Sequence, residues 1–171
     1  MLDIKSKIRE VQDFPKEGIN FKDITTLLKD KEAFKYVVDE MAKQLEGLDI
    51  DIIVGPEARG FIMGTPIAYK IGAGFVPVRK PNKLPAETIS HEYELEYGTD
   101  TIEIHKDSIK KGQRVAIVDD LLATGGTVLA TTKLIEELGG EVVSINFLMI
   151  LSFLEGKELL KNYKVDRLIE Y

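Results

Sequence analysis

Two adjacent carboxylates and a turn rich in glycine and threonine occupy residues 119–127. Asp119 and Asp120 follow the apolar run 115–118 and precede the turn Ala123-Thr124-Gly125-Gly126-Thr127. Glycines let backbone N–H groups approach an anion closely, and threonine hydroxyls can donate hydrogen bonds to phosphate oxygens. Carboxylates repel phosphate, so the two acids suit ribose hydroxyls or a Mg²⁺ on a neighbouring diphosphate. The pattern therefore predicts a site for a phosphorylated sugar.

The flanking residues predict the elements that would position this turn. The β-branched run 115–118 is typical of a buried strand, and residues 128–138 carry apolar side chains at helical spacing before the glycine pair 139–140. The turn would then lie at a helix N-terminus, which favours anions. A Walker loop would need a lysine where Thr127 and Val128 stand, and a dinucleotide fingerprint would need three spaced glycines. The alternative is an ordinary strand-to-helix turn with solvated acids. That alternative would be favoured for the Asp pair alone, but not for the pair together with the turn of glycines and threonines.

Length and composition are those of a globular single domain. The chain has 171 residues, of which 30% are charged and 44% hydrophobic, with a net charge of −6 that argues against nucleic acid as the main ligand. Cysteine is absent, and two histidines are too few for a histidine-rich metal site. We find neither a membrane-spanning run of ~20 apolar residues nor a signal-peptide pattern, and we expect a cytoplasmic protein with no membrane partner.

A second charged loop lies at residues 55–61, between a strand expected at 50–54 and a helical pattern that ends near residue 71. Arg59, next to Gly60 at the expected helix start, could clamp an oxyanion. It could equally be a surface side chain paired with Glu57, and the residues alone leave both interpretations open.

A third charged loop follows the strand expected at residues 74–78. Arg79, Lys80 and Lys83 lie within five residues, in the most basic part of an acidic chain. One basic pocket in such a chain suits selective capture of a multiply charged anion. A solvated loop is the usual alternative for a charge run.

Strands and helices alternate along the rest of the chain. Expected helices cover residues 2–11, 30–45 and 154–163, a hairpin covers 88–103, and late strands cover 142–149 and 165–169. This order predicts an α/β fold with a mostly parallel central sheet flanked by helices, in one domain over residues 1–171. Ligand loops should then gather outside the carboxyl ends of the strands.

Residues 115–127 resemble the phosphoribosyl diphosphate (PRPP) signature of type I phosphoribosyltransferases. Their form Val-Asp-Asp-Leu-Leu-Ala-Thr-Gly-Gly-Thr is similar to the adenine-specific branch of that family. Residues 55–61 resemble the family's diphosphate loop, with Pro56 in place of a more usual aliphatic residue, and residues 79–85 resemble its Arg-Lys-x-x-Lys-Leu-Pro pattern. The resemblance covers nearly the whole chain and implies the type I phosphoribosyltransferase fold.

The resemblance implies transfer of 5-phosphoribose from PRPP to adenine, giving AMP and diphosphate. The 5-phosphate would be held by Ala123, Thr124, Gly125, Gly126 and Thr127. Asp119 and Asp120 would hold the ribose hydroxyls and stabilise positive charge near C1′.

Diphosphate binding is implied for the two charged loops. Arg59, Arg79 and Lys83 would neutralise the leaving diphosphate together with Mg²⁺, and Glu57 and Ala58 belong to the same loop as Arg59. Most Mg²⁺ contacts would come from PRPP oxygens and water, so the chain itself is expected to offer no dedicated metal ligand.

The base would be held by an N-terminal hood, residues 1–30, in which residues 14–24 resemble the family's pattern Phe-Pro-x-x-Gly-(Ile/Val)-x-Phe-(Arg/Lys)-Asp-Ile. The resemblance implies that Phe21 lies against adenine and that the backbone near Asn20 reads its edge. Lys22 stands where many relatives carry Arg. The motif Leu-Glu-Tyr-Gly resembles the catalytic loop, in which Glu96 would polarise or protonate the purine and Tyr97 would exclude water.

The resemblance also implies a homodimer and leaves two alternatives. One is a phosphoribosyltransferase for another base, such as guanine, xanthine or a pyrimidine. The other is a PRPP-sensing regulator, but such regulators carry a DNA-binding module, and no helix-turn-helix pattern precedes residue 13. The presence of Glu96 and Arg59 favours an enzyme.

Overall fold

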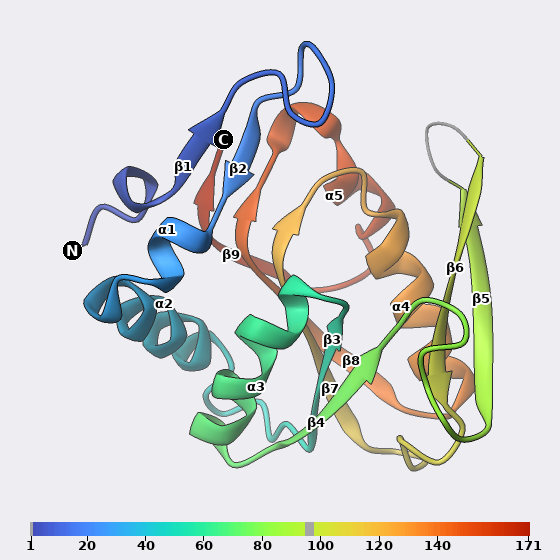
Figure 1. Cartoon of the computed structure of the whole chain (residues 1–171). Coiled ribbons are helices and arrows are strands. Elements are labelled where there is room, and N and C mark those ends of the chain that lie inside the picture. The colour runs from blue at the N-terminus through green and yellow to red at the C-terminus, as the bar shows by residue number, and fades with distance from the viewer. Residues whose placement is uncertain (1, 95–97) are drawn as a thin grey trace. The chain divides into compact units, whose positions relative to one another are not determined.

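The computed structural model describes residues 2–94 and 98–171 (Figure 1). The chain forms two compact units, with a boundary between residues 40 and 41. Helix α2, Lys31–Gln44, begins in the first unit and ends in the second. The predicted role of residues 1–30 as a hood stays a prediction.

The first unit is built around a short antiparallel strand pair. A 3-10 helix covers Lys5–Lys7, β1 covers Arg9–Val11, β2 covers Phe21–Asp23 and α1 covers Thr25–Leu28. Strands β1 and β2 pair from Arg9 opposite Asp23 to Val11 opposite Phe21. The helix predicted over residues 2–11 is therefore wrong, because hydrogen bonds to a distant segment override the local helical spacing.

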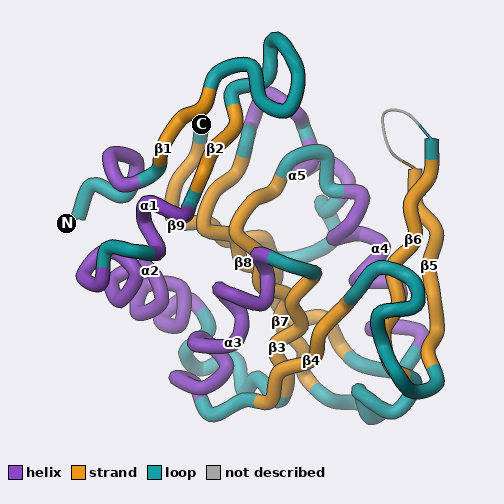
Figure 2. The backbone as a smooth tube through the Cα atoms, viewed as in Figure 1, coloured by secondary structure: helices purple, strands orange, loops and turns teal. Residues whose placement is uncertain are grey.

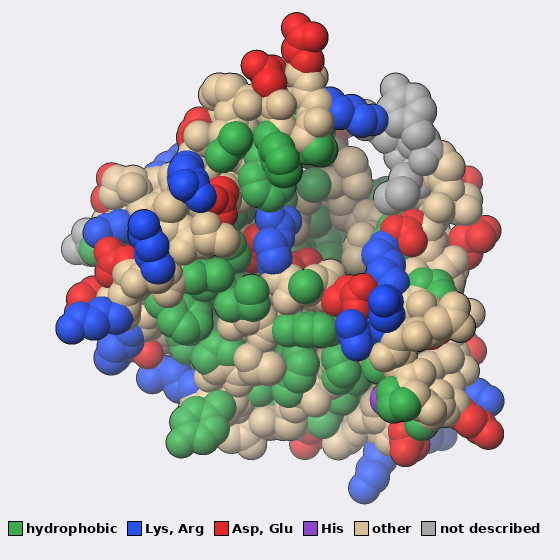
Figure 3. Space-filling view, in the orientation of Figure 1, with side chains coloured by type: hydrophobic (Ala, Val, Ile, Leu, Met, Phe, Trp, Pro, Cys, Tyr) green, Lys and Arg blue, Asp and Glu red, His purple; other side chains and the backbone are tan. Residues whose placement is uncertain are grey.

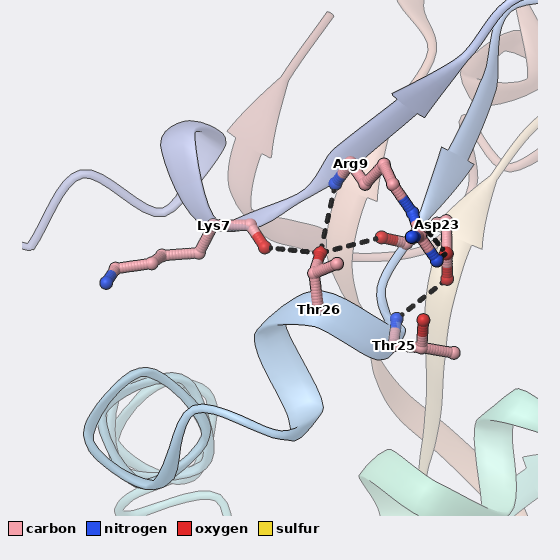
Figure 4. Close-up of polar contacts among 5 residues, drawn as sticks. All are labelled: Lys7, Arg9, Asp23, Thr25 and Thr26. Carbon is pink, nitrogen blue, oxygen red and sulfur yellow. Dashed lines mark hydrogen bonds and ion pairs between the residues drawn. The ribbon is translucent and has the colours of Figure 1, made fainter.

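Polar contacts fix the start of α1 to β1 and to the preceding 3-10 helix (Figure 4). The carboxylate of Asp23 accepts hydrogen bonds from the Thr25 N–H at 2.8 Å and from Arg9 Nε at 3.0 Å. These bonds, Thr25 first and then Arg9, lower the pKa of Asp23 to about 2. The Thr26 hydroxyl accepts from the Arg9 N–H at 3.1 Å and donates to the Lys7 carbonyl at 2.8 Å.

The second unit contains a five-stranded sheet in the order β4-β3-β7-β8-β9. Its strands are β3 Ile52–Pro56, β4 Gly74–Val78, β7 Arg114–Leu122, β8 Glu141–Ile150 and β9 Val165–Glu170. Every neighbouring pair is parallel. The predicted α/β fold with a mostly parallel central sheet is confirmed.

Helices cover this sheet, and a separate hairpin stands beside it. The helices are α3 Arg59–Ile71, α4 Gly126–Glu137 and α5 Gly156–Leu159, preceded by a 3-10 turn Ser152–Leu154. Helix α3 contacts β3, β4 and β7, whereas α4 contacts β8 and the hairpin (Figure 1). The hairpin pairs β5 Thr88–Glu94 with β6 Thr99–His105 (Figure 2). Fully buried Val54, Ile117 and Phe147 belong to the core of the unit.

The strand order creates a crevice between β3 and β7. From β3 the chain adds β4 on one side of the sheet and later β7 on the other side. In parallel sheets, ligands bind outside the carboxyl ends of strands at such a reversal of strand order. Residues 55–61 and 119–127 were both predicted to bind ligand, and they lie at these two strand ends.

Strand β7 is longer than predicted and includes the acid pair. Asp119 pairs in register with Phe147 and Leu121 with Met149, so the acids lie within the strand and not after it. The ladder with β8 extends the strand beyond its β-branched run. Because neighbouring strand residues point to opposite faces, Asp119 and Asp120 have different surroundings.

Candidate active site

A cavity of about 200 Å³ lies at the carboxyl ends of β3 and β7. It is lined by Pro56, Glu57, Arg59, Asp119, Leu121, Leu122, Ala123, Thr124, Gly125, Gly126, Thr127 and Val128. It therefore brings together the predicted phosphate turn, one of the two acids and part of the predicted diphosphate loop. Ala58, Arg79, Lys83 and Asp120 were also predicted site residues, but they are not among the lining residues.

The predicted phosphate turn leads directly into α4. Gly125 is the N-cap residue with φ +87°, a left-handed conformation that favours glycine, and α4 begins at Gly126. The first-turn N–H groups of a helix have no partner within the helix. Together with the hydroxyls of Thr124 and Thr127, they form the donor set that a phosphate needs.

Gly156 supports this turn from α5, and its role was not predicted from the sequence. A Cβ atom on Gly156 would lie 2.0 Å from the Ala123 carbonyl oxygen and 2.8 Å from the Thr124 carbonyl carbon. A Cβ atom on Gly125 would in turn lie 2.7 Å from the Gly156 carbonyl oxygen. The two backbones therefore touch, and side chains at either glycine would separate them.

The two acids differ in exposure and contacts. Asp119 lines the cavity, whereas Asp120 is 1% exposed and pairs with Arg59, with 3.2 Å between Nε and Oδ2. The start of α3 approaches Asp119 closely because residue 60 is glycine: a Cβ atom there would lie 3.2 Å from Asp119 Oδ1. Asp119 is thus placed to contact a ligand, and Asp120 is placed to orient Arg59.

Burial raises the pKa of both carboxyl groups. For Asp119 the cause is burial first and the neighbouring Asp120 carboxylate second, and its pKa lies well above the ordinary value. For Asp120 burial raises the pKa and the Arg59 guanidinium opposes that shift. A ligand that brings hydroxyl donors or positive charge to Asp119 would therefore stabilise the charged form of this carboxyl group.

The diphosphate loops interact through Glu57 and Arg79. Arg79 Nε donates to Glu57 Oε2 at 2.7 Å, and Arg79 Nη1 donates to the Lys83 carbonyl at 3.2 Å. The Glu57–Ala58 peptide bond is cis, and α3 begins at the next residue, Arg59. The sequence left two alternatives for Arg59, an oxyanion clamp or a surface pair with Glu57. The structure adds a third contact, the ion pair of Arg59 with Asp120.

Comparison with known proteins identifies the family. A family model described as phosphoribosyl transferase domain matches residues 25–169. The chain belongs to the phosphoribosyltransferase family. It is 72% identical, over 99% of its length and 100% of the relative's, to an adenine phosphoribosyltransferase of Alkaliphilus metalliredigens.

Solved structures agree with this assignment. The adenine phosphoribosyltransferase of Thermoanaerobacter pseudethanolicus matches with a TM-score of 0.97 and 62% identity, covering 99% of this chain and 98% of that one. The Saccharomyces cerevisiae enzyme, complexed with adenine and an imino-altritol bisphosphate, matches with a TM-score of 0.90 and 40% identity, covering 95% and 94%. The family resemblance identified from residues 115–127 is confirmed.

In this phosphoribosyltransferase, the third predicted charged loop also contacts the hairpin. The Lys80 ammonium pairs with the Asp100 carboxylate and lies 3.4 Å from the Tyr93 hydroxyl. Burial lowers the pKa of Lys80, but Asp100 and Tyr93 outweigh burial and raise it overall. The hydrogen bond from Lys80 lowers the pKa of Asp100. On the face drawn in Figure 3, basic side chains likewise lie among acidic ones.

The predicted base-contacting residues of the hood lie in the first unit. Phe21 makes an edge-to-face contact with Phe14, with 5.2 Å between ring centroids, and Asn20 Nδ2 donates to Glu10 Oε2 at 2.7 Å. The predicted contact of Phe21 and Asn20 with adenine stays a prediction. Glu96 and Tyr97 lie outside the described residues.

Residues 2–94 and 98–171 contain no group of three or more His, Cys, Asp or Glu side chains that could hold a metal ion. Asp119 and Glu57 are the carboxylates in the cavity lining, and Glu57 already pairs with Arg79, so Mg²⁺ fits here only if the ion has further oxygens from substrate and water. Within the described part of the chain, a helix with the length and hydrophobicity of a membrane span does not occur.

Proposed function

We propose that this chain transfers 5-phosphoribose from PRPP to adenine, forming AMP and diphosphate. The observation that carries the proposal is the cavity at the crevice between β3 and β7, where Asp119, Arg59 and residues 123–127 meet. The helix start that can bind an anion, the Asp119 carboxylate and the Arg59 guanidinium match the phosphate, sugar and diphosphate of a single substrate. The adenine assignment is supported by the relatives' names and by the adenine complex of the yeast enzyme.

The phosphate and the ribose bind to different residues of this cavity. The N–H groups at the start of α4 and the hydroxyls of Thr124 and Thr127 hold the 5-phosphate. Asp119 accepts hydrogen bonds from the ribose hydroxyls and stabilises positive charge that develops near C1′. Asp120 acts through Arg59, whose guanidinium it orients.

The diphosphate binds toward the positive side chains of the other two loops. Arg59 lines the cavity, and the bond from Arg79 to Glu57 directs a second guanidinium to the same loop. Lys83 is exposed beside Arg79 and adds charge. Bound Mg²⁺ would supply further neutralisation of the diphosphate charge, held mainly by PRPP oxygens and water with Asp119 nearby.

The reaction exchanges one bond at C1′ for another. Purine N9 donates an electron pair to C1′ while the bond from C1′ to the diphosphate oxygen breaks, and that electron pair leaves with diphosphate. The N9 proton must also leave, so an acid–base group near the purine would assist. We assign this role to Glu96, and the exclusion of water to Tyr97, on the family resemblance.

The remaining assignments rest on the same resemblance. We assign Phe21 and Asn20 to the adenine site and expect a homodimer. The large apolar side chains of Tyr69 and Ile62 on α3, 90% and 40% exposed, support self-association. The absence of cysteine supports a cytoplasmic location.

Product analysis tests the proposal. PRPP, adenine and Mg²⁺ are mixed with the protein, and AMP and diphosphate are quantified separately. Equal amounts of the two products, abolished by a chelator and restored by added Mg²⁺, are expected. Diphosphate and ribose 5-phosphate without AMP would mean that water, and not adenine, is the acceptor.

A further inference from the structure

The hydroxyl of Tyr93 in β5 lies beside the phosphate turn, a position that no sequence motif indicates. Thr127 Oγ1 lies 3.0 Å from Tyr93 Oη, and Tyr93 Oη lies 3.3 Å from Asp100 Oδ2. The Lys80 ammonium lies 3.4 Å from the same Tyr93 oxygen. A chain of hydrogen bonds therefore links the phosphate turn to the hairpin and to the loop after β4.

The Tyr93 ring also touches the turn. A Cβ atom on Gly126 would lie 3.1 Å from Tyr93 Cδ2, so the ring rests on the glycine backbone at the start of α4. The Lys80–Asp100 ion pair holds the hydroxyl end of the same side chain. Tyr93 is half-buried and fixed at both its ring and its hydroxyl.

The numbers of hydrogens that the Thr127 and Tyr93 hydroxyls can donate and accept determine how Tyr93 can act on Thr127. A hydroxyl donates one hydrogen but can accept from another donor. Thr127 donates to Tyr93 here, and Tyr93 donates to Asp100. If Tyr93 turns its hydrogen toward Thr127, the Thr127 hydrogen becomes available to a phosphate oxygen. The Lys80 ammonium can still donate to the Tyr93 oxygen after this turn.

We propose that Tyr93 is a positioning residue for the 5-phosphate, because its hydroxyl directs the Thr127 hydroxyl toward the bound phosphate. This inference rests on the proposed function, in which Thr127 contacts that phosphate. Tyr93 itself does not touch substrate. Its loss should therefore weaken phosphate binding through Thr127 and leave the chemical step nearly unchanged.

Tyr93→Phe tests the role of the hydroxyl and keeps the ring on Gly126. We expect the dissociation constant for ribose 5-phosphate, measured by calorimetry, to rise about fivefold, as for loss of one hydrogen bond. The KM for PRPP should rise similarly, with kcat within about twofold of the parent. Tyr163→Phe is the matched control, since its hydroxyl donates to Glu136 at 2.7 Å and lies outside the cavity lining.

A double-mutant cycle separates positioning from general structure. Thr127→Val removes the hydroxyl through which Tyr93 acts, so adding Tyr93→Phe should then weaken ribose 5-phosphate binding no further. In a Thr127→Ser background, which keeps a hydroxyl, the Tyr93→Phe effect should return. The inference would be overturned if Tyr93→Phe raised the dissociation constant for ribose 5-phosphate by the same factor in the Thr127→Val background as in the parent. It would also be overturned if Tyr93→Phe alone left this binding unchanged. If the parent fails to bind ribose 5-phosphate, the proposed phosphate site itself is wrong.

Discussion

At the scale of single residues, the acid pair combines one side chain that faces the cavity with one that is buried. The sequence indicated that both acids lie next to a phosphate-binding turn, and it predicted the same role for both, binding of the ribose hydroxyls. The difference arises because β7 continues through both residues and turns them to opposite faces. The strand end and the approach of Arg59 depend on tertiary pairing, which local sequence does not encode.

Replacing Asp119 by Asn should stabilise the fold and weaken PRPP use. A carboxyl group with a raised folded-state pKa contributes stability below about pH 4, the ordinary aspartate pKa, and that contribution is lost as pH rises through the folded-state pKa. The amide avoids this loss, so at pH 7 we expect Tm to rise by about 2–4 °C. Loss of a charged acceptor for the ribose should lower kcat/KM for PRPP by about 10–100-fold.

The pH dependence supplies the control for this prediction. The gain in Tm should shrink as pH falls toward 4, where the parent carboxyl group is also neutral. Asp107→Asn, at an exposed aspartate, should leave both Tm and PRPP use within error of the parent. A lower Tm for Asp119→Asn at pH 7 would contradict the burial argument.

Glu96→Gln tests the acid–base role that we assign to Glu96 at the purine ring. An amide cannot exchange a proton at the ring, so we expect kcat to fall by about 100-fold or more while the KM for PRPP stays within about twofold. Steady-state kinetics at saturating adenine measures both quantities. Glu92→Gln, at an exposed glutamate in β5, is the control. Activity equal to the parent would remove Glu96 from the mechanism.

At the scale of elements, the phosphate turn was predictable but its support was not. Glycines and threonines after a β-branched run identified the turn and the start of α4 directly. Gly156 follows 30 residues after Gly126 in a stretch predicted only as a helix, and its contact with Ala123 is purely spatial. Such contacts between distant backbones have no local sequence signal.

Gly156→Ala should disturb the phosphate turn through α5. The added methyl would lie 2.0 Å from the Ala123 carbonyl oxygen, which is backbone and must shift. We expect the KM for PRPP to rise by about tenfold and Tm to fall by about 2–8 °C, the range for overpacking.

Gly74→Ala is the matched control for Gly156→Ala. Its Cβ atom would meet the flexible end of the Ile52 side chain at 2.9 Å, away from the cavity. PRPP kinetics of this variant should match those of the parent. An equal loss of PRPP affinity in both variants would mean that the Gly156 effect is a general loss of stability.

Strands and short helices differed in how well the sequence predicted them. The buried parallel strands followed from β-branched runs, and the strand expected at residues 74–78 matches β4. The helix expected at residues 2–11 is replaced by a 3-10 helix at Lys5–Lys7 and by β1 at Arg9–Val11, because β1 depends on pairing with β2. The helix expected at 154–163 is limited to α5 and the preceding 3-10 turn.

At the scale of the whole molecule, the central sheet was predictable because alternating strands and helices leave few arrangements. The order β4-β3-β7-β8-β9 places two of the predicted ligand loops at one crevice. The sequence could not show that Arg79 and Lys80 would pair with Glu57 and Asp100, since those partners come from other elements.

Self-association is the next prediction at this scale. We expect light scattering to give a mass twice that of one chain at micromolar concentration, in agreement with the homodimer implied by the family resemblance. The mass should stay constant on moderate dilution, as for a stable interface. A single-chain mass at every concentration would contradict the homodimer.

The proposed activity is that the site in the crevice between β3 and β7 catalyses the transfer of 5-phosphoribose from PRPP to adenine. The most direct measurement is diphosphate release from PRPP and Mg²⁺ with adenine, guanine, hypoxanthine, xanthine and orotate offered separately. We predict rapid release with adenine alone. Release with a different base would contradict the adenine assignment and keep the PRPP site, whereas tight PRPP binding without release for any base would contradict catalysis and favour a PRPP sensor.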